Sequence, residues 1–299
     1  MELRVLRYFL AVTKAESVSG AAETLNITQP TLSRQLMDLE NELGATLFHR
    51  GRRNQKVTLT EAGVFLRKHA EEIISLTDKT EAAFSLSGDS ITGDIYICAG
   101  ETDAIRILAR AAKKLRERCP KIHYHISSGD GADVEERLDK GLADFGIVLG
   151  VVDRNRYEAQ ALPFKDRWGV LMRRDDPMAR LENICPEDLY NKPLILSRQT
   201  ISDAQILRWL NKPKEELNIV ATYSLVYNAA IMTVENIGYT LTLDKLINNA
   251  DLCFRPLKDS PELPIYLIWK KYQAFSRAAN LFLNQFRQEI TEYSKSMFF

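Results

Sequence analysis

Leucines recur at spacings of four, three and four residues in one segment near the N-terminus, at Leu32, Leu36, Leu39 and Leu43. This spacing places all four side chains on one face of an α-helix. Thr28 can cap the start of that helix, Pro30 is tolerated in its first turn, and Gly44 can end it. The segment is therefore predicted to be a helix with one buried face and one exposed face.

Two further helices are predicted before it. Apolar residues from Leu3 to Thr13 recur at helical spacing, and Ser17 can cap a second helix. That second helix carries Ala21 and Ala22, whose small side chains let two helices cross closely. Three short helices of this kind are typical of a helix-turn-helix. On the apolar pattern alone, an ordinary helical bundle remains the alternative.

The segment that follows the third helix is basic. Residues 49–56 include no acidic residue but four basic ones, Arg50, Arg52, Arg53 and Lys56. Gly51 and Asn54 favour a turn, and apolar alternation resumes at Val57 and Leu59. This pattern predicts a β-hairpin wing beside the helices. Since the whole chain balances 40 Lys and Arg against 40 Asp and Glu, an argument for DNA binding rests on this segment and not on net charge.

The exposed face of the leucine helix predicts contacts with DNA bases. If the leucines are buried, Gln29 and Arg34 are exposed in its N-terminal half, where a recognition helix enters the major groove. Gln pairs well with adenine and Arg with guanine, whereas wing arginines attract the phosphate backbone. The candidate DNA-binding residues are Thr28, Gln29, Pro30, Thr31, Ser33, Arg34, Arg50, Arg52 and Arg53.

A long helix is predicted from Thr60, without Gly or Pro between residues 64 and 87. Its apolar or small residues alternate at spacings of four and three, at Leu66, Ala70, Ile73, Thr77, Thr80 and Phe84. Such a heptad pattern predicts a partner helix, and hence a dimer. Packing of this face within the same chain is the alternative. A polar, glycine-containing hinge follows at residues 87–93.

Beyond the hinge, strands alternate with helices, which predicts parallel βαβ units in two successive rounds and two lobes with a cleft between them. Strands are predicted at residues 94–99, 121–127, 143–149, 168–173, 193–197, 219–224, 239–243 and 265–270. Helices are predicted at residues 102–118, 132–140, 202–211, 225–236 and 275–293.

Residues 21–63 resemble the DNA-binding sequence of LysR-type transcriptional regulators. The resemblance is carried by Ala21, Ala22, Leu25, Thr28, Gln29, Pro30, Leu32, Ser33, Leu36, Leu39, Glu40, Leu43, Gly44, Leu47, Phe48, Arg50, Leu59, Thr60 and Gly63. It implies an α + α/β chain with a winged helix-turn-helix, a linker helix and a two-lobed effector domain of periplasmic-binding-protein type. The expected boundaries are 1–60, 61–91 and 92–299, with lobe I at about 92–162 and 266–299 and lobe II at about 163–265.

The resemblance also implies what such a chain binds. Its partners would be double-stranded promoter DNA, a small-molecule effector, and a second copy joined through the linker helices, with dimers pairing into a homotetramer. RNA polymerase is a further candidate partner. By position, the expected effector-binding residues are Gly100, Glu101, Thr102, Ser128, Ser197, Arg198, Gln199, Thr200, Tyr223, Tyr227 and Thr242.

One departure from the family pattern concerns two acids, Glu101 and Asp103, which flank Thr102. Many family members bind anionic effectors, and two acids here would repel a carboxylate. Either the effector is cationic or zwitterionic and Glu101 holds its amine, or Asp103 caps a helix while Glu101 faces water. The sequence leaves both readings open.

The sequence lacks the motifs that would indicate an enzyme or a cofactor site. We find no nucleophile elbow, dinucleotide-binding glycine motif, P-loop or metal-spaced histidine pair, so neither an enzyme nor a cofactor or metal site is predicted. The four cysteines show no paired spacing and are expected to be reduced thiols rather than redox sensors. With no signal peptide and no apolar run of membrane-spanning length, the expected location is the cytoplasm, away from membranes.

Overall fold

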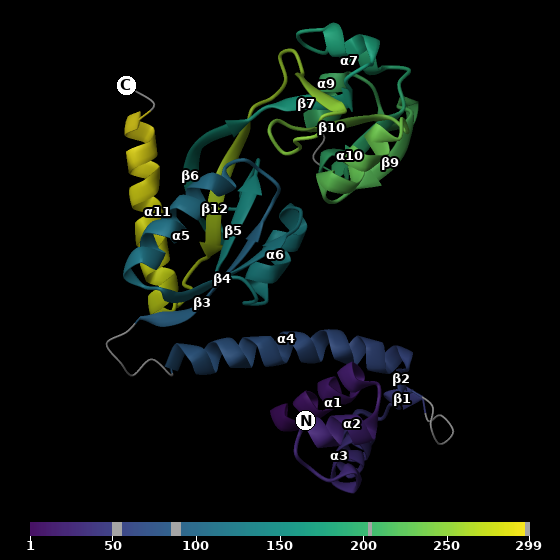
Figure 1. Ribbon diagram of the computed structural model, residues 1–299, viewed down its shortest axis with the longest axis vertical. Helices are drawn as coiled ribbons and strands as arrows, with labels where there is room; N and C mark the ends of the chain where they lie inside the picture. Colours follow the sequence, from purple (N-terminus) through teal and green to yellow (C-terminus); the bar gives the residue numbers. More distant parts are fainter. Residues whose placement is uncertain (50–55, 85–90, 203–204, 297–299) are drawn as a thin grey trace. The chain divides into compact units, whose positions relative to one another are not determined.

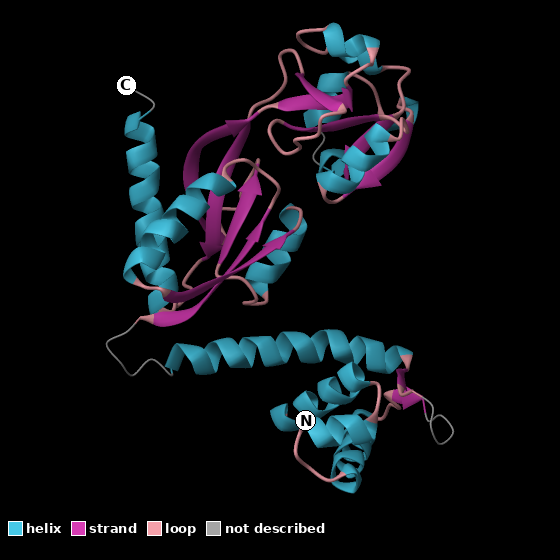
Figure 2. Ribbon diagram, in the orientation of Figure 1, coloured by secondary structure: helices cyan, strands magenta, loops and turns pink. Residues whose placement is uncertain are grey.

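The computed structural model describes residues 1–49, 56–84, 91–202 and 205–296. The chain divides into two compact units, Met1–Ser85 and Leu86–Phe299. Figure 1 colours them along the sequence, with the first unit in purple to blue and the second in blue-green to yellow. Figure 2 shows that the first is almost entirely helical, whereas the second mixes helices with sheets.

The first unit holds three short helices, a small hairpin and one long helix. They are α1 (Leu3–Ala15), α2 (Val18–Thr24), α3 (Gln29–Leu43), β1 (Phe48–His49), β2 (Thr58–Leu59) and α4 (Glu61–Phe84). Phe9 and Val12 of α1 lie fully buried with Leu32 of α3 and Leu47 in one apolar core. The predicted leucine face of α3 is confirmed for Leu32, Leu36 and Leu39, whereas Leu43 at the helix end is exposed.

Predicted capping residues start and end these helices. The Ser17 hydroxyl accepts a hydrogen bond from Gly20 N at 3.2 Å, and the Thr28 hydroxyl accepts one from Thr31 N at 3.4 Å. Gly44 ends α3 with a φ of 62°, in the left-handed region that favours glycine. These local interactions confirm the helix boundaries that the sequence predicted.

The base of the predicted wing is present as a two-stranded sheet. Strands β1 and β2 pair antiparallel, with Phe48 opposite Leu59 and His49 opposite Thr58. The predicted wing arginines Arg50, Arg52 and Arg53 lie outside the described residues.

The predicted heptad face of α4 packs within its own chain over its first half. Leu66, Ala70 and Ile74 lie in the core of the first unit, beside helix α1. The prediction that this face meets a partner helix is therefore wrong for Leu66 and Ala70. A different side of α4 leaves apolar surface uncovered, at Phe65 (69% exposed) and Leu76 (45% exposed).

The second unit begins with a five-stranded sheet, which defines lobe I. In spatial order the strands are β4 (Lys121–Ser128), β3 (Thr92–Ala99), β5 (Phe145–Leu149), β12 (Leu263–Lys270) and β6 (Tyr157–Asp166). Strand β3 pairs parallel with β4 and β5, whereas β12 pairs antiparallel with β5 and β6.

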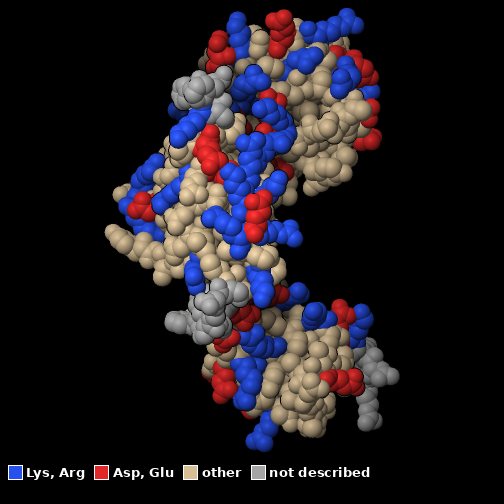
Figure 3. All heavy atoms as spheres, turned by 60° about the vertical axis from the view of Figure 1, so that its left-hand side comes forward, with Lys and Arg blue, Asp and Glu red and all other residues tan. Residues whose placement is uncertain are grey.

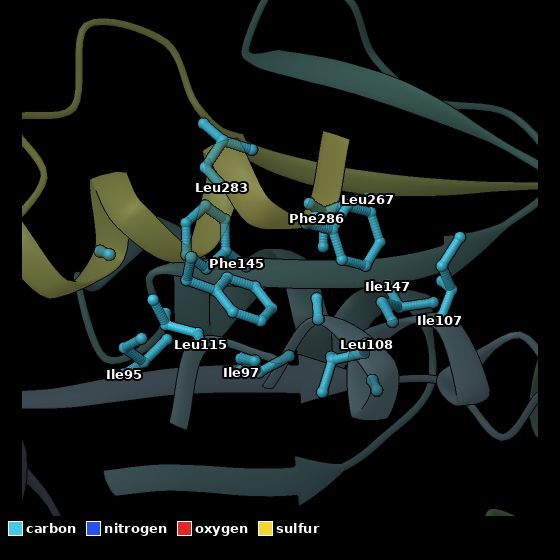
Figure 4. Close-up of a cluster of buried hydrophobic side chains, with 14 of the residues drawn as sticks. Ile95, Ile97, Ile107, Leu108, Leu115, Phe145, Ile147, Leu267, Leu283 and Phe286 are labelled. Atoms are coloured by element: carbon cyan, nitrogen blue, oxygen red, sulfur yellow. The ribbon is translucent and has the colours of Figure 1, made fainter. Parts of the chain in front are cut away.

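Helices cover both faces of this sheet. Helices α5 (Ile105–Arg118) and α11 (Arg277–Ser296) pack together on one face, and α6 (Gly131–Asp139) lies on the other. Figure 4 shows the larger core, which holds Phe145 of β5 together with Phe286 and Leu283 of α11, and the ring of Phe145 packs against that of Phe282. A smaller core joins Val134 and Leu138 of α6 to the opposite face. The faces are thus buried by helices, as predicted for βαβ units.

Lobe II has its own five-stranded sheet, ordered β11 (Leu252–Pro256), β7 (Trp168–Arg173), β10 (Tyr239–Leu243), β8 (Leu194–Ser197) and β9 (Ile219–Tyr223). One sheet face packs on α10 (Val226–Val234), and the other buries the core that includes α9 (Gln205–Leu210). Short helical turns complete the lobe: η1 (Pro177–Arg180), α7 (Pro186–Leu189), α8 (Arg198–Ser202) and η2 (Lys214–Glu216).

Two strands, β6 and β11, were not predicted. Strand β6 contains Pro163 and the charged residues Glu158 and Lys165, and β11 ends at Pro256, so neither resembles a buried parallel strand. Both pair antiparallel with their neighbours. They also carry the chain between the lobes, since β6 continues into β7 and the segment after β11 returns to β12. Both sheets therefore combine the predicted parallel pairs with antiparallel ones.

Acidic and basic side chains are mixed on the surface. Figure 3 shows Lys and Arg side chains beside Asp and Glu side chains over one face of the molecule. This agrees with a formal net charge of zero.

The close approach of Gly63 to Leu47 and Leu59 allows a test of how the first unit is packed. A Cβ atom added there would lie 2.1 Å from the backbone oxygen of Leu47 and 2.9 Å from Leu59 Cδ2. Because the backbone must shift to relieve this clash, Gly63→Ala should lower the free energy of unfolding of this unit by about 1–3 kcal/mol. The measurement is chemical denaturation followed by circular dichroism. Gly20→Ala is the control, since its Cβ would meet only ordinary contacts at 3.6 Å, and equal losses in both variants would contradict the packing described.

Candidate functional site

Helix α3 presents a polar face opposite its buried leucines. Gln29, Pro30, Thr31 and Arg34 are exposed, and Ser33 is half-buried. Gln29 Nε2 donates to Ser33 Oγ at 2.9 Å, one helical turn apart. The hydroxyls of Thr28 and Thr31 lie 2.8 Å apart at the start of the helix. The structure therefore brings the six candidate residues of α3 together at its N-terminal end.

Two polar side chains, one of them Thr60 at the predicted start of the long helix, attach the wing base to these helices. Glu40 of α3 accepts a hydrogen bond from Leu47 N at 2.7 Å, and Thr60 Oγ1 donates to Thr46 O at 2.6 Å. Thr60 Oγ1 also accepts from Gly63 N at 3.0 Å, which caps α4. Both residues belong to the motif in residues 21–63, so the motif itself carried the signal.

A cavity lies between lobes I and II, with about 740 Å³ of space including its open mouth. Its walls come from the loops that follow strands of both sheets. Eight of the predicted effector-binding residues line it: Gly100, Glu101, Ser197, Arg198, Gln199, Thr200, Tyr223 and Thr242. Apolar side chains complete the lining: Leu149, Trp168, Ile206, Val226, Leu243, Leu246 and Leu263.

Three predicted effector-binding residues do not line this cavity. Thr102 is buried, and its hydroxyl accepts a hydrogen bond from Ala104 N at 3.1 Å. Ser128 is exposed at the end of β4, and Tyr227 is 67% exposed on α10. Each neighbours a lining residue in sequence, but its side chain is directed elsewhere by the local backbone.

The hydroxyl groups of the lobe II wall are bonded within the wall. Ser197 Oγ accepts from Thr200 N at 2.9 Å and lies 2.6 Å from Thr200 Oγ1. The Tyr223 hydroxyl donates to Leu241 O at 2.8 Å, and burial raises the pKa of Tyr223, so this side chain stays neutral. These bonds hold the wall in a defined shape.

Two polar contacts join the lobes across the cavity. Val226 N, the first residue of α10, donates to Glu101 Oε2 at 2.6 Å. Arg198 Nη2 of lobe II lies 3.1 Å from Asp130 Oδ2 and 3.6 Å from Asp133 Oδ2 of lobe I. Burial raises the pKa of Glu101, which is half-buried, while the Val226 amide partly opposes the shift. The possibility that Glu101 merely faces water is thus wrong. Asp103 does not cap α5 either, since among the described residues no side chain caps the start of this helix and the Asp103 carboxylate pairs with Arg106.

Asp130 was missed although its sequence carried a signal. It precedes Asp133 by three residues, and the two form a reciprocal capping box at the start of α6. Trp168 was missed as well. It lines the cavity, and within the described part of the chain its indole N–H has no hydrogen-bond partner. No local pattern marks such a residue, because its position depends on the meeting of two lobes.

His125 of strand β4 and the four cysteines have structural surroundings. His125 Nε2 lies 2.9 Å from Asp94 Oδ1, and its ring stacks on Tyr96. Within residues 1–49, 56–84, 91–202 and 205–296, no group of three or more potential ligands could hold a metal ion. The four cysteines are free thiols, and burial raises the pKa of Cys98 and Cys253. Among the described helices, none has both the length and the apolar character to cross a membrane.

Family comparisons match both units. A model described as "LysR substrate binding domain" matches residues 88–291, more than half of the chain. The chain belongs to the LysR family. A second model, "Bacterial regulatory helix-turn-helix protein, lysR family", matches residues 3–64.

Named relatives in the LysR family include transcriptional regulators. The chain is 33% identical over 148 residues to the HTH-type transcriptional activator IlvY of Salmonella typhimurium, a match that spans 50% of each protein. It thus spans about half the length of the first curated relatives it matches. It is 28% identical to the Hca operon transcriptional activator HcaR of Escherichia coli, over 91% of this chain and 92% of that one.

Solved LysR-family structures share the fold. The structure of full-length CbnR complexed with target DNA matches with a TM-score of 0.71 and 19% identity, over 97% of this chain and 100% of that chain. Full-length BenM matches with a TM-score of 0.55 and 24% identity, over 98% of each. At these identities the likeness concerns the fold alone.

A buried acid beside the cavity of this LysR-family chain gives a pH prediction. Asp166 is 8% exposed, Thr102 bonds its carboxylate, and its Oδ2 has no partner among described atoms. Burial raises its pKa, so the folded state holds this proton at pH values where the unfolded state has released it, and stability falls as pH rises through that window. Asp166→Asn cannot ionise. Its unfolding temperature should therefore exceed that of wild type near pH 7, and the difference should be smaller near pH 4.

Thermal unfolding over this pH range provides the measurement. Glu158→Gln, an exposed acid on the same strand, is the control and should leave the pH profile of wild type unchanged. Lower stability of Asp166→Asn at every pH would contradict the view that ionisation of this buried carboxyl is costly.

Proposed function

We propose that this LysR-family chain is a sequence-specific DNA-binding transcription regulator whose activity is controlled by a small-molecule effector bound between lobes I and II. One observation carries this proposal. The same chain combines a helix-turn-helix, whose α3 exposes Gln29 and Arg34, with a two-lobed domain whose lobes enclose a lined cavity. The names of the relatives, which are transcriptional activators and regulators, support it.

The DNA contact follows from the buried face of α3. Because Leu32, Leu36 and Leu39 fix the orientation of the helix, its opposite face is free to enter a major groove. Arg34 would read guanine and Gln29 adenine. Thr28, Pro30, Thr31 and Ser33 would position the helix, and the proposed wing residues Arg50, Arg52 and Arg53 would supply phosphate contacts. We propose no catalytic residue and no membrane partner, and we place this activity in the cytoplasm.

Self-association is proposed through α4. Phe65 and Leu76 lie eleven residues apart, a spacing of three helical turns that places both on one side of α4. Large apolar side chains exposed on a long helix favour burial against a partner helix. We therefore propose this side, in place of the one predicted from Leu66 and Ala70, as the dimer face. By analogy with the LysR family, we also propose that dimers pair into a tetramer and that RNA polymerase is a partner.

The first test is a titration of the full-length protein against the DNA flanking its own gene, with random DNA as the control and rising salt. Tight, salt-sensitive binding with preference for the flanking DNA is expected. Arg34→Ala should weaken the specific binding about 10- to 100-fold, since one base contact contributes about 1–3 kcal/mol. Arg116→Ala removes the same charge from an exposed position on α5 and should leave it unchanged. Unaltered affinity in Arg34→Ala would mean that α3 is not the reading helix.

The dimer face has its own test. Replacing Phe65 and Leu76 together by Lys should convert the dimer to monomers at micromolar concentration, because two charges would be buried at the interface. Sedimentation velocity measures the change. Val64→Lys is the control, since Val64 is also exposed but lies on another side of α4. An unchanged sedimentation coefficient in the double variant would exclude this side of the helix as the interface.

A further inference from the structure

The cavity wall carries more acidic than basic side chains. Its charged lining residues are Glu101, Asp130 and Arg198, two acids against one base. Arg198 already contacts Asp130 and Asp133, so its charge is compensated across the cavity mouth. Because Asp130 and Arg198 of the lining pair with each other, Glu101 supplies the excess negative charge of a largely apolar wall. A ligand that enters this space meets a negative site.

Glu101 also occupies the place where an anion would bind best. The first amide groups of a helix attract negative charge, and α10 begins at the cavity wall. Its first amide, Val226 N, donates to Glu101 Oε2 at 2.6 Å. A ligand carboxylate would have to displace a carboxylate that the chain itself holds there. It would also be repelled by that same group at short range.

The loop geometry holds Glu101 in this position. Gly100 precedes it, and a Cβ atom on Gly100 would lie 2.8 Å from Leu149 Cδ1, so the backbone passes close against β5. Gly100 N donates to Ile147 O at 2.9 Å, which extends the pairing of β3 with β5 by one residue. The position of the Glu101 side chain is thus set by sheet pairing on one side and by α10 on the other.

Burial makes the negative charge of Glu101 unfavourable, because the Val226 amide bonds it but does not neutralise it. The carboxylate is half-buried, and desolvation raises its pKa with only the Val226 amide in opposition. A positive group brought by a ligand would relieve this cost, because an opposite charge at close range favours the ionised carboxylate. A neutral or negative ligand would not. The physical complement of this wall is therefore a cation with an apolar body.

We propose that the cavity selects a ligand that carries an ammonium group on an apolar body, and that Glu101 both holds the ammonium group and keeps carboxylates away from α10. This inference rests on the proposed function, since it names the chemical class of the effector. It gives Glu101 a role in specificity, while the apolar wall residues accommodate the body of the ligand.

The test compares ligands that differ only in their head group. The probes are 2-phenylethylamine and isopentylamine, each matched with a carboxylate of similar shape, 3-phenylpropionate and 4-methylpentanoate. Binding to the full-length protein is measured by thermal shift and by calorimetric titration. At least one amine should bind at least tenfold more tightly than its matched carboxylate. Stronger binding of the carboxylates, or no difference between head groups, would overturn the proposal.

Variants assign the selectivity to Glu101. Glu101→Gln keeps the size of the side chain but removes its charge, and should reduce the preference for amines at least tenfold. Glu101→Ala vacates the first amide of α10 and should increase carboxylate affinity. Asp103→Asn is the control, because Asp103 lies in the same loop but outside the cavity lining and pairs with Arg106. Equal losses in the Asp103 and Glu101 variants would contradict the assignment.

The outcomes separate this inference from the proposed function. The wild-type comparison needs no variant, so a Glu101 variant that fails to fold leaves the head-group test intact. The same protein preparations are titrated with flanking and random DNA. If specific DNA binding is present but amines are not preferred, the inference fails and the proposed regulator remains. If specific DNA binding is absent, the proposed function fails irrespective of the ligand result.

Discussion

Parallel strand pairing determines where this protein can hold a ligand. In lobe I, β3 pairs parallel with β4 and β5, and in lobe II, β8 pairs parallel with β9 and β10. The carboxyl ends of parallel strands meet at one edge of a sheet, and ligands of open α/β folds bind there. Glu101, Ser197 and Tyr223 lie at or just after these ends and line the cavity. The site is therefore a consequence of the topology, and the side chains at the strand ends decide its chemistry.

In the first unit, burial of apolar side chains fixes the orientation of helix α3. Burial of one face of α3 leaves the opposite face available for DNA, and the hydrogen bonds of Glu40 and Thr60 attach the wing base to the same core. An apolar core of this size resists rotation of the helix, because turning Leu32 or Leu36 outward would expose their side chains to water. The orientation of the proposed recognition residues is thus set mainly by the buried leucine face of α3.

Features governed by neighbours in sequence were predictable, and features governed by distant contacts were not. Caps at Ser17 and Thr28 and the leucine face of α3 follow from local spacing. The heptad pattern of α4 could not reveal its partner, because the same side of a helix can pack on α1 or on a second chain. Strands β6 and β11 were missed since their antiparallel pairing removes the need for a continuous apolar run. The contact of Glu101 with Val226 joins residues 125 positions apart and has no local signal.

We propose that ligand binding in the cavity controls DNA binding. Nuclease protection of the operator by the full-length protein, with and without a compound shown to bind the cavity, tests this claim directly. Linkage predicts that the compound changes the protected region or the operator affinity, and that the operator changes the compound's affinity by the same factor. A compound that saturates the cavity while protection and affinity both stay unchanged would show that the cavity and the DNA-binding unit are not coupled.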